Sequence, residues 1–87
     1  MPPTEFSVSD LRRILIAAAG PGDGVQLADD TADCSFDELG YESLALLETG
    51  SRIERELGIA LSDSEIVDAR TPRELIAAVN AHLHTLA

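Results

Sequence analysis

Residues 43–57 read SLALLETGSRIEREL and are followed by Gly58. Because each residue of an α-helix turns the chain by about 100°, this segment gathers its apolar and small side chains on one face. The members of that face are Leu46, Thr49, Gly50, Ile53 and Leu57. Leu44 and Glu48 fall on the opposite face, which leaves Leu44 as an apolar residue near solvent. The pattern predicts an amphipathic helix that packs on a core and ends at Gly58.

Another helix is predicted before this segment. Ser7 and Asp10 are typical of a helix start, and the apolar residues that follow line one helical stripe: Val8, Leu11, Ile14, Leu15 and Ala18. The helix is expected to end near Gly20, because Gly20-Pro21-Gly22-Asp23-Gly24 combines a residue without an N–H donor with flexible glycines.

The segment between these two helices, from about residue 20 to 41, is long for a loop in so short a chain. Its apolar residues Val25, Leu27 and Phe36 are expected to anchor it to the core. Residues 35–38 read SFDE, which has the spacing of a capping box, and Leu39-Gly40 follows. This pattern predicts one helical turn that glycine stops.

Two further helices are predicted after Gly58. Residues 62–65 read SDSE, a capping-box spacing that leads into Ile66-Val67 and predicts a helix of one or two turns. Residues 71–74 read TPRE, which combines an N-cap, a proline at the first helical position and a Glu at the third. The stripe of this last helix is Leu75, Ile76, Val79, Leu83 and Leu86.

The resulting fold class is all-α. Because the chain has no alternating strand pattern and no internal repeat, we expect a small four-helix bundle with three main helices, a short third helix and a long first loop. A chain of 87 residues is expected to form a single domain over 1–87, with short flexible termini.

Composition limits the classes of function. The chain has no Trp and a small aliphatic core, which leaves little interior for an enclosed active site, so we do not expect an enzyme. Its formal net charge of −10 disfavours binding to nucleic acid and to anionic membranes. The same charge favours encounter with proteins that present Arg and Lys patches. Alternatively, the acidity only keeps a small protein in solution.

Cysteine use and hydropathy point to a compartment. Cys34 is the only cysteine, so no intramolecular disulfide can form and a reducing environment is the simplest location. The apolar runs are too short to cross a bilayer, and residues 1–5 lack the layout of a signal peptide. These features predict a cytoplasmic protein, which we expect to be a monomer.

Few residues are placed for autonomous chemistry. Ser43 is a natural N-cap for the helix it opens, and no His or Lys near it in the sequence could act as its base. His82 and His84 are two residues apart and fall on different helix faces, so they do not form a shared metal site. Residues 29–33, DDTAD, lack the glycine and the distal Glu of a calcium loop. We therefore predict no metal site.

Residues 37–48, DELGYESLALLE, resemble the attachment motif of acyl carrier proteins, in which the pattern is Gly-x-Asp-Ser-Leu. Gly40, Ser43 and Leu44 match it, whereas Glu42 stands where the family usually has Asp. The resemblance extends over nearly the whole chain, including the long first loop, the short third helix and the TPRE opening of the last one. It is strongest to the discrete carriers of type II aromatic polyketide synthases.

This resemblance implies a carrier protein of antibiotic biosynthesis that has no catalytic residues. Ser43 would hold 4′-phosphopantetheine covalently, and the arm's thiol would carry acyl and polyketide intermediates as thioesters. The family's partners are a phosphopantetheinyl transferase, a ketosynthase pair, a malonyl acyltransferase, a ketoreductase and aromatase/cyclase enzymes. The residues expected to recognise partners are Glu42, Leu44, Leu47 and Glu48. Arg73 and Asn80, which share a flank of the apolar stripe of the last helix, are possible contacts of a polar intermediate; alternatively, they are solvated surface residues. The glutamate at position 42 could slow modification.

Three other interpretations remain open from the sequence. The chain could be a fatty-acid or peptidyl carrier, which shares the motif. It could be an unmodified acidic interaction module, in which Ser43 is only a helix cap. A hydrolase that uses Ser43 is the weakest of the three, because no base is placed for it.

Overall fold

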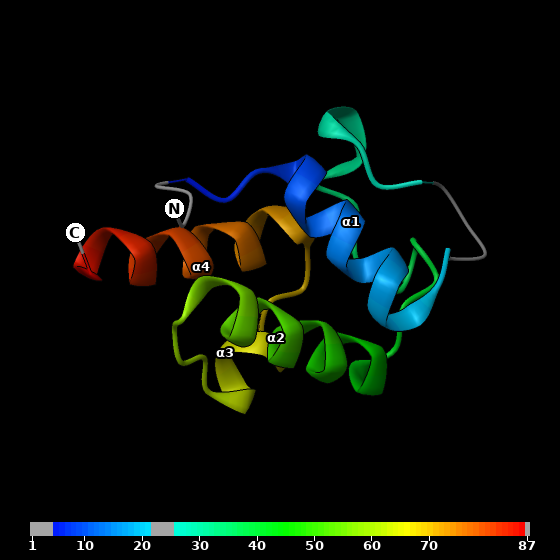
Figure 1. The fold of residues 1–87 in the computed structure, drawn as a ribbon. Coiled ribbons are helices and arrows are strands. Elements are labelled where there is room, and N and C mark those ends of the chain that lie inside the picture. Colours follow the sequence, from blue (N-terminus) through cyan, green and yellow to red (C-terminus); the bar gives the residue numbers. More distant parts are fainter. Residues whose placement is uncertain (1–4, 22–25, 87) are drawn as a thin grey trace.

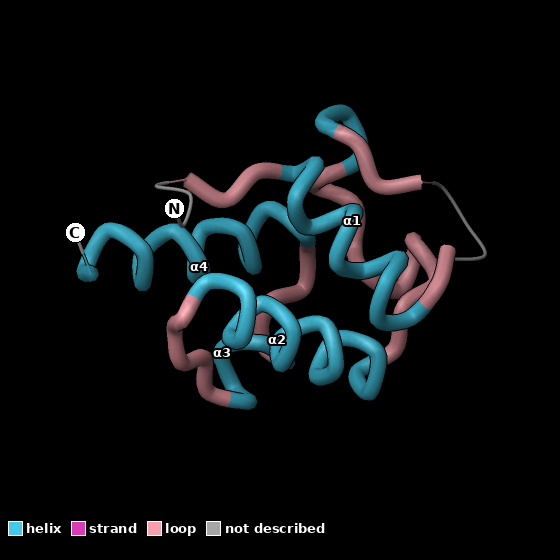
Figure 2. Tube along the Cα trace, in the orientation of Figure 1, coloured by secondary structure: helices cyan, strands magenta, loops and turns pink. Residues whose placement is uncertain are grey.

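The computed structural model describes residues 5–21 and 26–86 and places its helices where the sequence predicts them. In chain order the elements are α1 (Val8–Ala19), a 3₁₀ turn η1 (Asp29–Thr31), α2 (Ser43–Leu57), α3 (Asp63–Val67) and α4 (Pro72–Leu86). Figures 1 and 2 show helices and loops, with no strand in the described ranges. The predicted all-α bundle with one short helix is confirmed. Residues 1–4 and 87, part of the termini that we predicted to be flexible, lie outside the described residues.

The bundle is built on α2. This helix packs along α1 on one side and against α3 on the other, while α4 contacts both α1 and α3. The predicted face of α2 is the buried one, and even Thr49 is fully buried because its hydroxyl donates to the Ala45 carbonyl at 2.8 Å. The inward side chains of the other long helices are the predicted ones: Leu11, Ile14, Leu15, Leu75, Val79 and Leu83.

Three of the four helices begin with a side-chain cap. The Ser7 hydroxyl accepts from the Asp10 N–H at 3.2 Å, and the Ser62 hydroxyl accepts from the Glu65 N–H at 3.1 Å. At the start of α4, Thr71 accepts from the Glu74 N–H at 3.2 Å. Each cap satisfies an N–H group that the helix leaves unpaired, typically worth about 1 kcal/mol. Helix α2 lacks such a cap.

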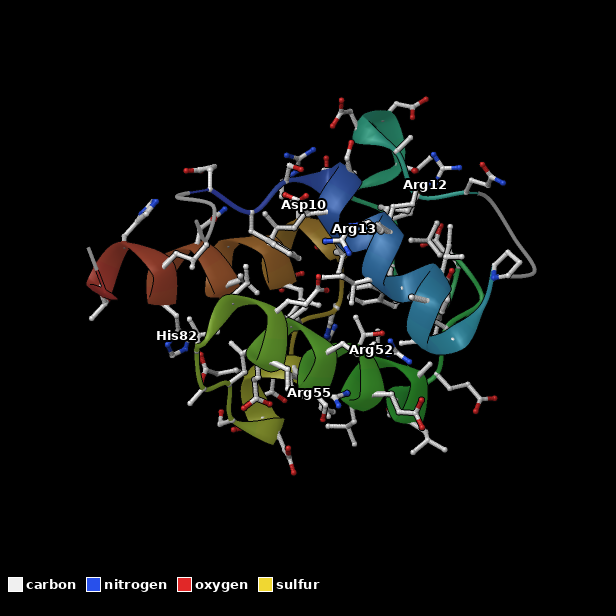
Figure 3. The ribbon with its side chains drawn as sticks, in the orientation of Figure 1. Asp10, Arg12, Arg13, Arg52, Arg55 and His82 are labelled. Carbon is white, nitrogen blue, oxygen red and sulfur yellow. The ribbon has the colours of Figure 1, made fainter. Side chains whose placement is uncertain are left out.

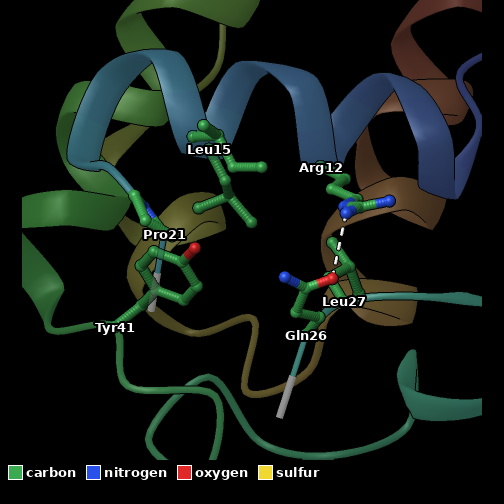
Figure 4. A pocket seen from close by; sticks show the side chains of 7 residues that line it. Arg12, Leu15, Pro21, Gln26, Leu27 and Tyr41 are labelled. Atoms are coloured by element: carbon green, nitrogen blue, oxygen red, sulfur yellow. Dashed lines mark hydrogen bonds between the residues drawn. The ribbon is translucent and has the colours of Figure 1, made fainter. Parts of the chain in front are cut away.

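The long loop between α1 and α2 is tied to the bundle through hydrogen bonds. The Tyr41 hydroxyl donates to the Gly20 carbonyl at 3.1 Å, and Arg12 donates to the Gln26 side chain at 3.0 Å. Figure 4 shows Tyr41 beneath α1, beside a cavity of about 20 Å³. Leu27 is buried as predicted, whereas Val25 lies outside the described residues.

Hydrogen bonds to the segment around the start of α4 hold the last part of this loop. The Phe36 N–H donates to the Arg70 carbonyl at 2.9 Å, and the Arg73 N–H donates to the Ala32 carbonyl at 3.0 Å. Residues 36–40 form the predicted single turn, because the Leu39 N–H bonds the Ser35 carbonyl at 3.1 Å. Gly40 ends it with a φ of 88°, a value that side chains strongly disfavour. The turn and its anchors fix the approach to α2.

No helix in residues 5–21 and 26–86 is long and apolar enough to span a bilayer. These residues also contain no group of three or more His, Cys, Asp and Glu side chains arranged to hold a metal ion.

One predicted pH dependence arises where α3 meets α4. The Glu65 carboxylate accepts from the Ser62 N–H at 3.1 Å and lies 2.8 Å from His82 Nε2. The Ser62 N–H, followed by the His82 contact, lowers the pKa of the Glu65 carboxyl below its ordinary 4.5. A lowered pKa adds stability that is present above the unfolded-state pKa and is lost as the pH falls through the folded-state pKa.

We therefore expect Glu65→Gln to destabilise the protein at neutral pH, with the difference from wild type shrinking as the pH falls below 4.5. Urea unfolding at a series of pH values measures this. The control is Asp63→Asn in the same turn, whose carboxylate has no side-chain hydrogen bond in the described part of the chain. A Glu65→Gln difference that stays constant into acid would contradict the prediction.

Candidate functional site

Ser43 is the first residue of α2 and is exposed. The sequence predicted it as the N-cap, and this prediction is wrong by one position. Glu42 holds the extended N-cap conformation, with φ −95° and ψ 169°. The preceding turn ends at Gly40, so the helix begins at Ser43 and not at the residue after it. As the first helical residue, Ser43 does not use its hydroxyl to cap the helix.

The start of α2 leaves its first backbone N–H groups without a side-chain acceptor. No side chain caps it, and its first turn carries no acidic residue. The Ser43 hydroxyl has no hydrogen-bond partner among the described residues. Because the first N–H groups of a helix lack intrahelical acceptors, an exposed hydroxyl beside them suits a modification that brings a negative charge.

Ser43 lines an open groove of about 370 Å³. We call it the α2–α3 groove; its other lining residues are Ser35, Phe36, Asp37, Tyr41, Leu46, Val67, Ala69 and Arg70. Val67 is 45% exposed and gives the groove an apolar wall at the end of α3, and Arg70 is its cation. A flexible chain attached at Ser43 would therefore have an apolar surface and a guanidinium within the same groove.

A second groove, of about 360 Å³, adjoins the same end of α2. We call it the α1–α2 groove; it is lined by Ala18, Ala19, Pro21, Gly40, Tyr41, Glu42, Leu44, Ala45 and Glu48. Three of the four residues predicted to recognise partners meet here, and Leu44 is 69% exposed. The arrangement offers an apolar contact flanked by two carboxylates to an approaching protein surface.

Leu47 does not share this groove. Its side chain is half-buried and packs against the hydrophobic core. Leu47 therefore lies at the border of the core face, and its recognition role stays a prediction.

Arg73 and Asn80, the possible contacts of an intermediate, each have a partner within the fold. Arg73 Nε donates to Asp33 at 2.7 Å and joins α4 to the long loop. Asn80 accepts from the Phe6 N–H at 2.6 Å and donates to the Phe6 carbonyl at 3.1 Å, which fixes the segment before α1. Neither side chain lines the α2–α3 groove. Helical spacing put the two on one flank of α4 but could not reveal these partners.

Sequence reasoning missed the residues that other elements bring to the site. Val67 is the last residue of α3, and Ala69 and Arg70 follow that helix. Ala18 lies at the end of α1, and Pro21 follows it. One signal was available: Val67 adjoins the core residue Ile66 in a five-residue helix, so one of two neighbouring apolar side chains had to face solvent. For Arg70 the sequence held no comparable signal.

Asp37 is the one carboxylate among the residues that line the Ser43 groove, and it forms no hydrogen bond with the Ser43 hydroxyl. The groove contains no His, and both histidines lie on α4 with carboxylate partners, His82 with Glu65 and His84 with Glu5. The arrangement can hold a modification but offers Ser43 no base.

Comparison with known proteins agrees with this geometry. The family described as "Phosphopantetheine attachment site" matches residues 9–79. The granaticin polyketide synthase acyl carrier protein of Streptomyces violaceoruber is 55% identical over 75 residues, covering 86% of this chain and 88% of that protein. The monensin polyketide synthase acyl carrier protein of Streptomyces virginiae is 56% identical over 78 residues, covering 90% of this chain and 88% of that protein.

A solved structure extends the likeness to the fold. The actinorhodin holo acyl carrier protein of Streptomyces coelicolor superposes with a TM-score of 0.83 at 39% identity, with 100% of both chains covered. The family match, the relatives and the fold all lead to one conclusion: the chain belongs to the phosphopantetheine attachment site family and, within it, to the acyl carrier proteins of type II polyketide synthases.

Proposed function

We propose that Ser43 is the residue through which this carrier holds 4′-phosphopantetheine and, on it, acyl and polyketide intermediates. The observation that carries the proposal is the exposed, unpartnered hydroxyl of Ser43 at the uncapped start of α2, inside the residues that match the family.

The residues around Ser43 fit the group. Its phosphate would lie by the first N–H groups of α2, where the helix dipole favours an anion. When bound, phosphopantetheine supplies a terminal thiol that holds acyl groups as thioesters. Leu46 and Val67 offer apolar surface to the attached chain, and Arg70 offers a donor for its polar atoms. Glu42 keeps its carboxylate free of any capping bond, so its charge stays available to an enzyme that docks here.

The chain acts on nothing by itself in this proposal. Because none of the described residues is hydrogen-bonded to the Ser43 hydroxyl as a base, we expect a phosphopantetheinyl transferase to supply the chemistry of attachment. The other proposed partners are the ketosynthase pair, malonyl acyltransferase, ketoreductase and aromatase/cyclase enzymes of a polyketide synthase. Glu42, Leu44 and Glu48 would meet them at the α1–α2 groove. A single 1–87 domain, its monomeric state and its cytoplasmic location stay predictions from the sequence.

Intact-mass measurement tests the proposal. After incubation with coenzyme A, magnesium and a broad-specificity phosphopantetheinyl transferase, the protein should gain the mass of one phosphopantetheine, and peptide mapping should place it on Ser43. Folded protein that gains nothing would favour the interaction module, and a gain on another residue would remove the assignment to Ser43.

The α2–α3 groove gives a second prediction, which concerns the attached chain. Arg70 lines the groove, whereas Arg73 is paired with Asp33. A β-ketoacyl group on the arm should therefore contact Arg70 and shift the NMR signals of the neighbouring Val67 and Ala69 amides. We expect Arg70→Ala to reduce these NMR shift differences between the modified and the acylated protein. Arg73→Ala is the matched control and should leave them unchanged, since an exposed ion pair contributes at most about 1 kcal/mol to the fold. If Arg73→Ala reduced the shift differences and Arg70→Ala left them unchanged, Arg73 would be the residue that contacts the acyl group.

A further inference from the structure

We propose that Arg70 decides which of the two grooves beside Ser43 holds the attached arm. Its guanidinium pairs with an anionic oxygen of the arm and keeps the arm in the α2–α3 groove, away from the α1–α2 groove. Arg70 is thus a positioning residue. The inference rests on the proposed function, because it needs phosphopantetheine at Ser43, and it adds where the arm rests and why.

Neither size nor apolar surface favours one groove over the other. The α2–α3 groove measures about 370 Å³ and the α1–α2 groove about 360 Å³. Ser43 lines the first, and its neighbours Glu42 and Leu44 line the second. Each has an exposed apolar side chain, Val67 in the first and Leu44 in the second. An arm attached at Ser43 can therefore reach both grooves, and another property must decide between them.

The two grooves differ in charge. The α1–α2 groove has two carboxylates, Glu42 and Glu48, and no Arg or Lys among its described lining residues. The α2–α3 groove has one carboxylate, Asp37, and one cation, Arg70. The phosphodiester that would join the arm to Ser43 is an anion, so it is attracted toward Arg70 and repelled by the two glutamates. Arginine binds such oxygen atoms with two parallel N–H groups.

The side chain of Arg70 is exposed and available for this contact. Within residues 5–21 and 26–86 no carboxylate lies at ion-pair distance from its guanidinium, and Asp37 is among those that do not reach it. Its main chain is held in place, because its carbonyl accepts from the Phe36 N–H at 2.9 Å and Thr71 caps α4 directly after it. The fold therefore fixes the backbone of Arg70 beside the groove and leaves the charge unpaired.

No other cation in the described part of the chain is placed to compete. All six basic residues of the protein are arginines. Figure 3 shows four of them on α1 and α2: Arg12, Arg13, Arg52 and Arg55. None of these four lines either groove, and Arg73 is paired with Asp33 at 2.7 Å. Arg70 is the cation that the fold brings beside Ser43.

The choice of groove affects docking. Glu42, Leu44 and Glu48 are the residues proposed to meet partner enzymes at the α1–α2 groove. An arm that rests in the α2–α3 groove leaves this surface uncovered, so a partner can bind before it takes up the arm. Because an exposed ion pair is weak, it favours one groove by only roughly twofold to fivefold. The arm can therefore leave Arg70 when an enzyme docks.

NMR of the modified protein measures where the arm rests. The reporters are amides whose shifts change on attachment and that lie on other elements than Ser43: Val67 and Ala69 for the α2–α3 groove, Ala18 and Ala19 for the α1–α2 groove. In wild type we expect the larger changes at Val67 and Ala69. In Arg70→Gln these changes should fall by roughly a quarter to a half, because a twofold to fivefold preference is lost, and those at Ala18 and Ala19 should rise.

Two variants separate charge from other causes. Arg70→Lys keeps the charge and should retain most of the wild-type pattern. Arg52→Gln removes the same charge from an exposed position of α2 that lines neither groove, and should retain the pattern fully. In about 1 M salt, where the screening length is about 3 Å, wild type should resemble Arg70→Gln. The inference is overturned if Arg70→Gln shows the wild-type changes, or if Arg70→Lys reduces them as much as Arg70→Gln does.

The same measurement on acetyl-loaded and malonyl-loaded protein identifies the anion. An acetyl group adds no charge to the arm, whereas a malonyl group adds a terminal carboxylate. If Arg70 pairs with the phosphodiester, as its bond to Ser43 favours, Arg70→Gln has the same effect in the unacylated, acetyl and malonyl proteins. An effect confined to the malonyl protein assigns the pairing to the carboxylate of the cargo. No effect in any of the three overturns the inference.

A chemical attachment separates failure of this inference from failure of the proposed function, which intact mass reports first. In Cys34→Ser/Ser43→Cys protein, disulfide exchange attaches 2-mercaptoethyl phosphate or, as the neutral control, 2-mercaptoethanol. Adding Arg70→Gln should reduce the Val67 and Ala69 shift changes caused by the phosphate and leave those caused by the neutral group unaltered. An equal effect of Arg70→Gln on both adducts would overturn the inference, even if the transferase loads nothing.

Discussion

Replacing Ser43 with alanine is expected to abolish loading of phosphopantetheine completely while leaving the fold intact. The hydroxyl is the proposed point of attachment, and alanine has no atom to replace it. Because this hydroxyl is exposed and makes no hydrogen bond among the described residues, its loss should change the free energy of unfolding by less than about 0.5 kcal/mol. Intact mass reports the loading, and urea unfolding reports the stability.

The stability measurement also decides between the two positions considered for Ser43. If the residue were the N-cap that the sequence suggested, alanine would cost about 1 kcal/mol. The structure makes it the first helical residue, where alanine is well tolerated. Ser51→Ala is the matched control, since Ser51 is an exposed serine of the same helix and should load fully. If Ser43→Ala protein were loaded to the same extent as wild type, another residue would carry the group.

Local sequence signals were enough to predict the helices. Each capping pattern became a helix start or a turn, and the buried face of α2 is the predicted one, from Leu46 to Leu57. These features depend on residues within one or two turns of each other, so spacing alone determines them. The position of Ser43 relative to the cap was wrong by one, because it depends on the positive φ of Gly40 and the extended Glu42 rather than on cap preference.

The grooves could not be predicted, because their walls come from distant parts of the chain. Arg70 reaches the α2–α3 groove because its carbonyl accepts from Phe36, 34 residues earlier. The spacing also did not reveal the ion pair between Arg73 and Asp33, which are 40 residues apart. Helical spacing places residues on a face but does not say which loop covers it. The family motif supplied what spacing could not, namely the proposed role of Ser43.

Gly50→Ala is expected to destabilise the protein, although helix propensity alone predicts the reverse. Gly50 lies in the middle of α2, and alanine there would add about 1 kcal/mol if only the helix mattered. However, a Cβ at this position would overlap Cδ1 of Ile66 and lie 3.0 Å from its Cγ1. Ile66 is 1% exposed and anchors α3, so it has little room to move. Overpacking of this kind costs about 1–3 kcal/mol, measurable by urea unfolding.

A second substitution identifies the cause. Ile66→Val removes Cδ1, the atom that the new methyl group would overlap, and alone should cost about 0.5–1.5 kcal/mol. In the Gly50→Ala/Ile66→Val double variant we expect a loss smaller than the sum of the two single losses, because residues in contact couple. Additive losses, or a Gly50→Ala protein more stable than wild type, would show that α3 can move away from α2 freely. Val67 follows Ile66 and forms a wall of the α2–α3 groove. If α3 could move freely, the close packing of Ile66 on Gly50 would not fix the position of this wall beside Ser43.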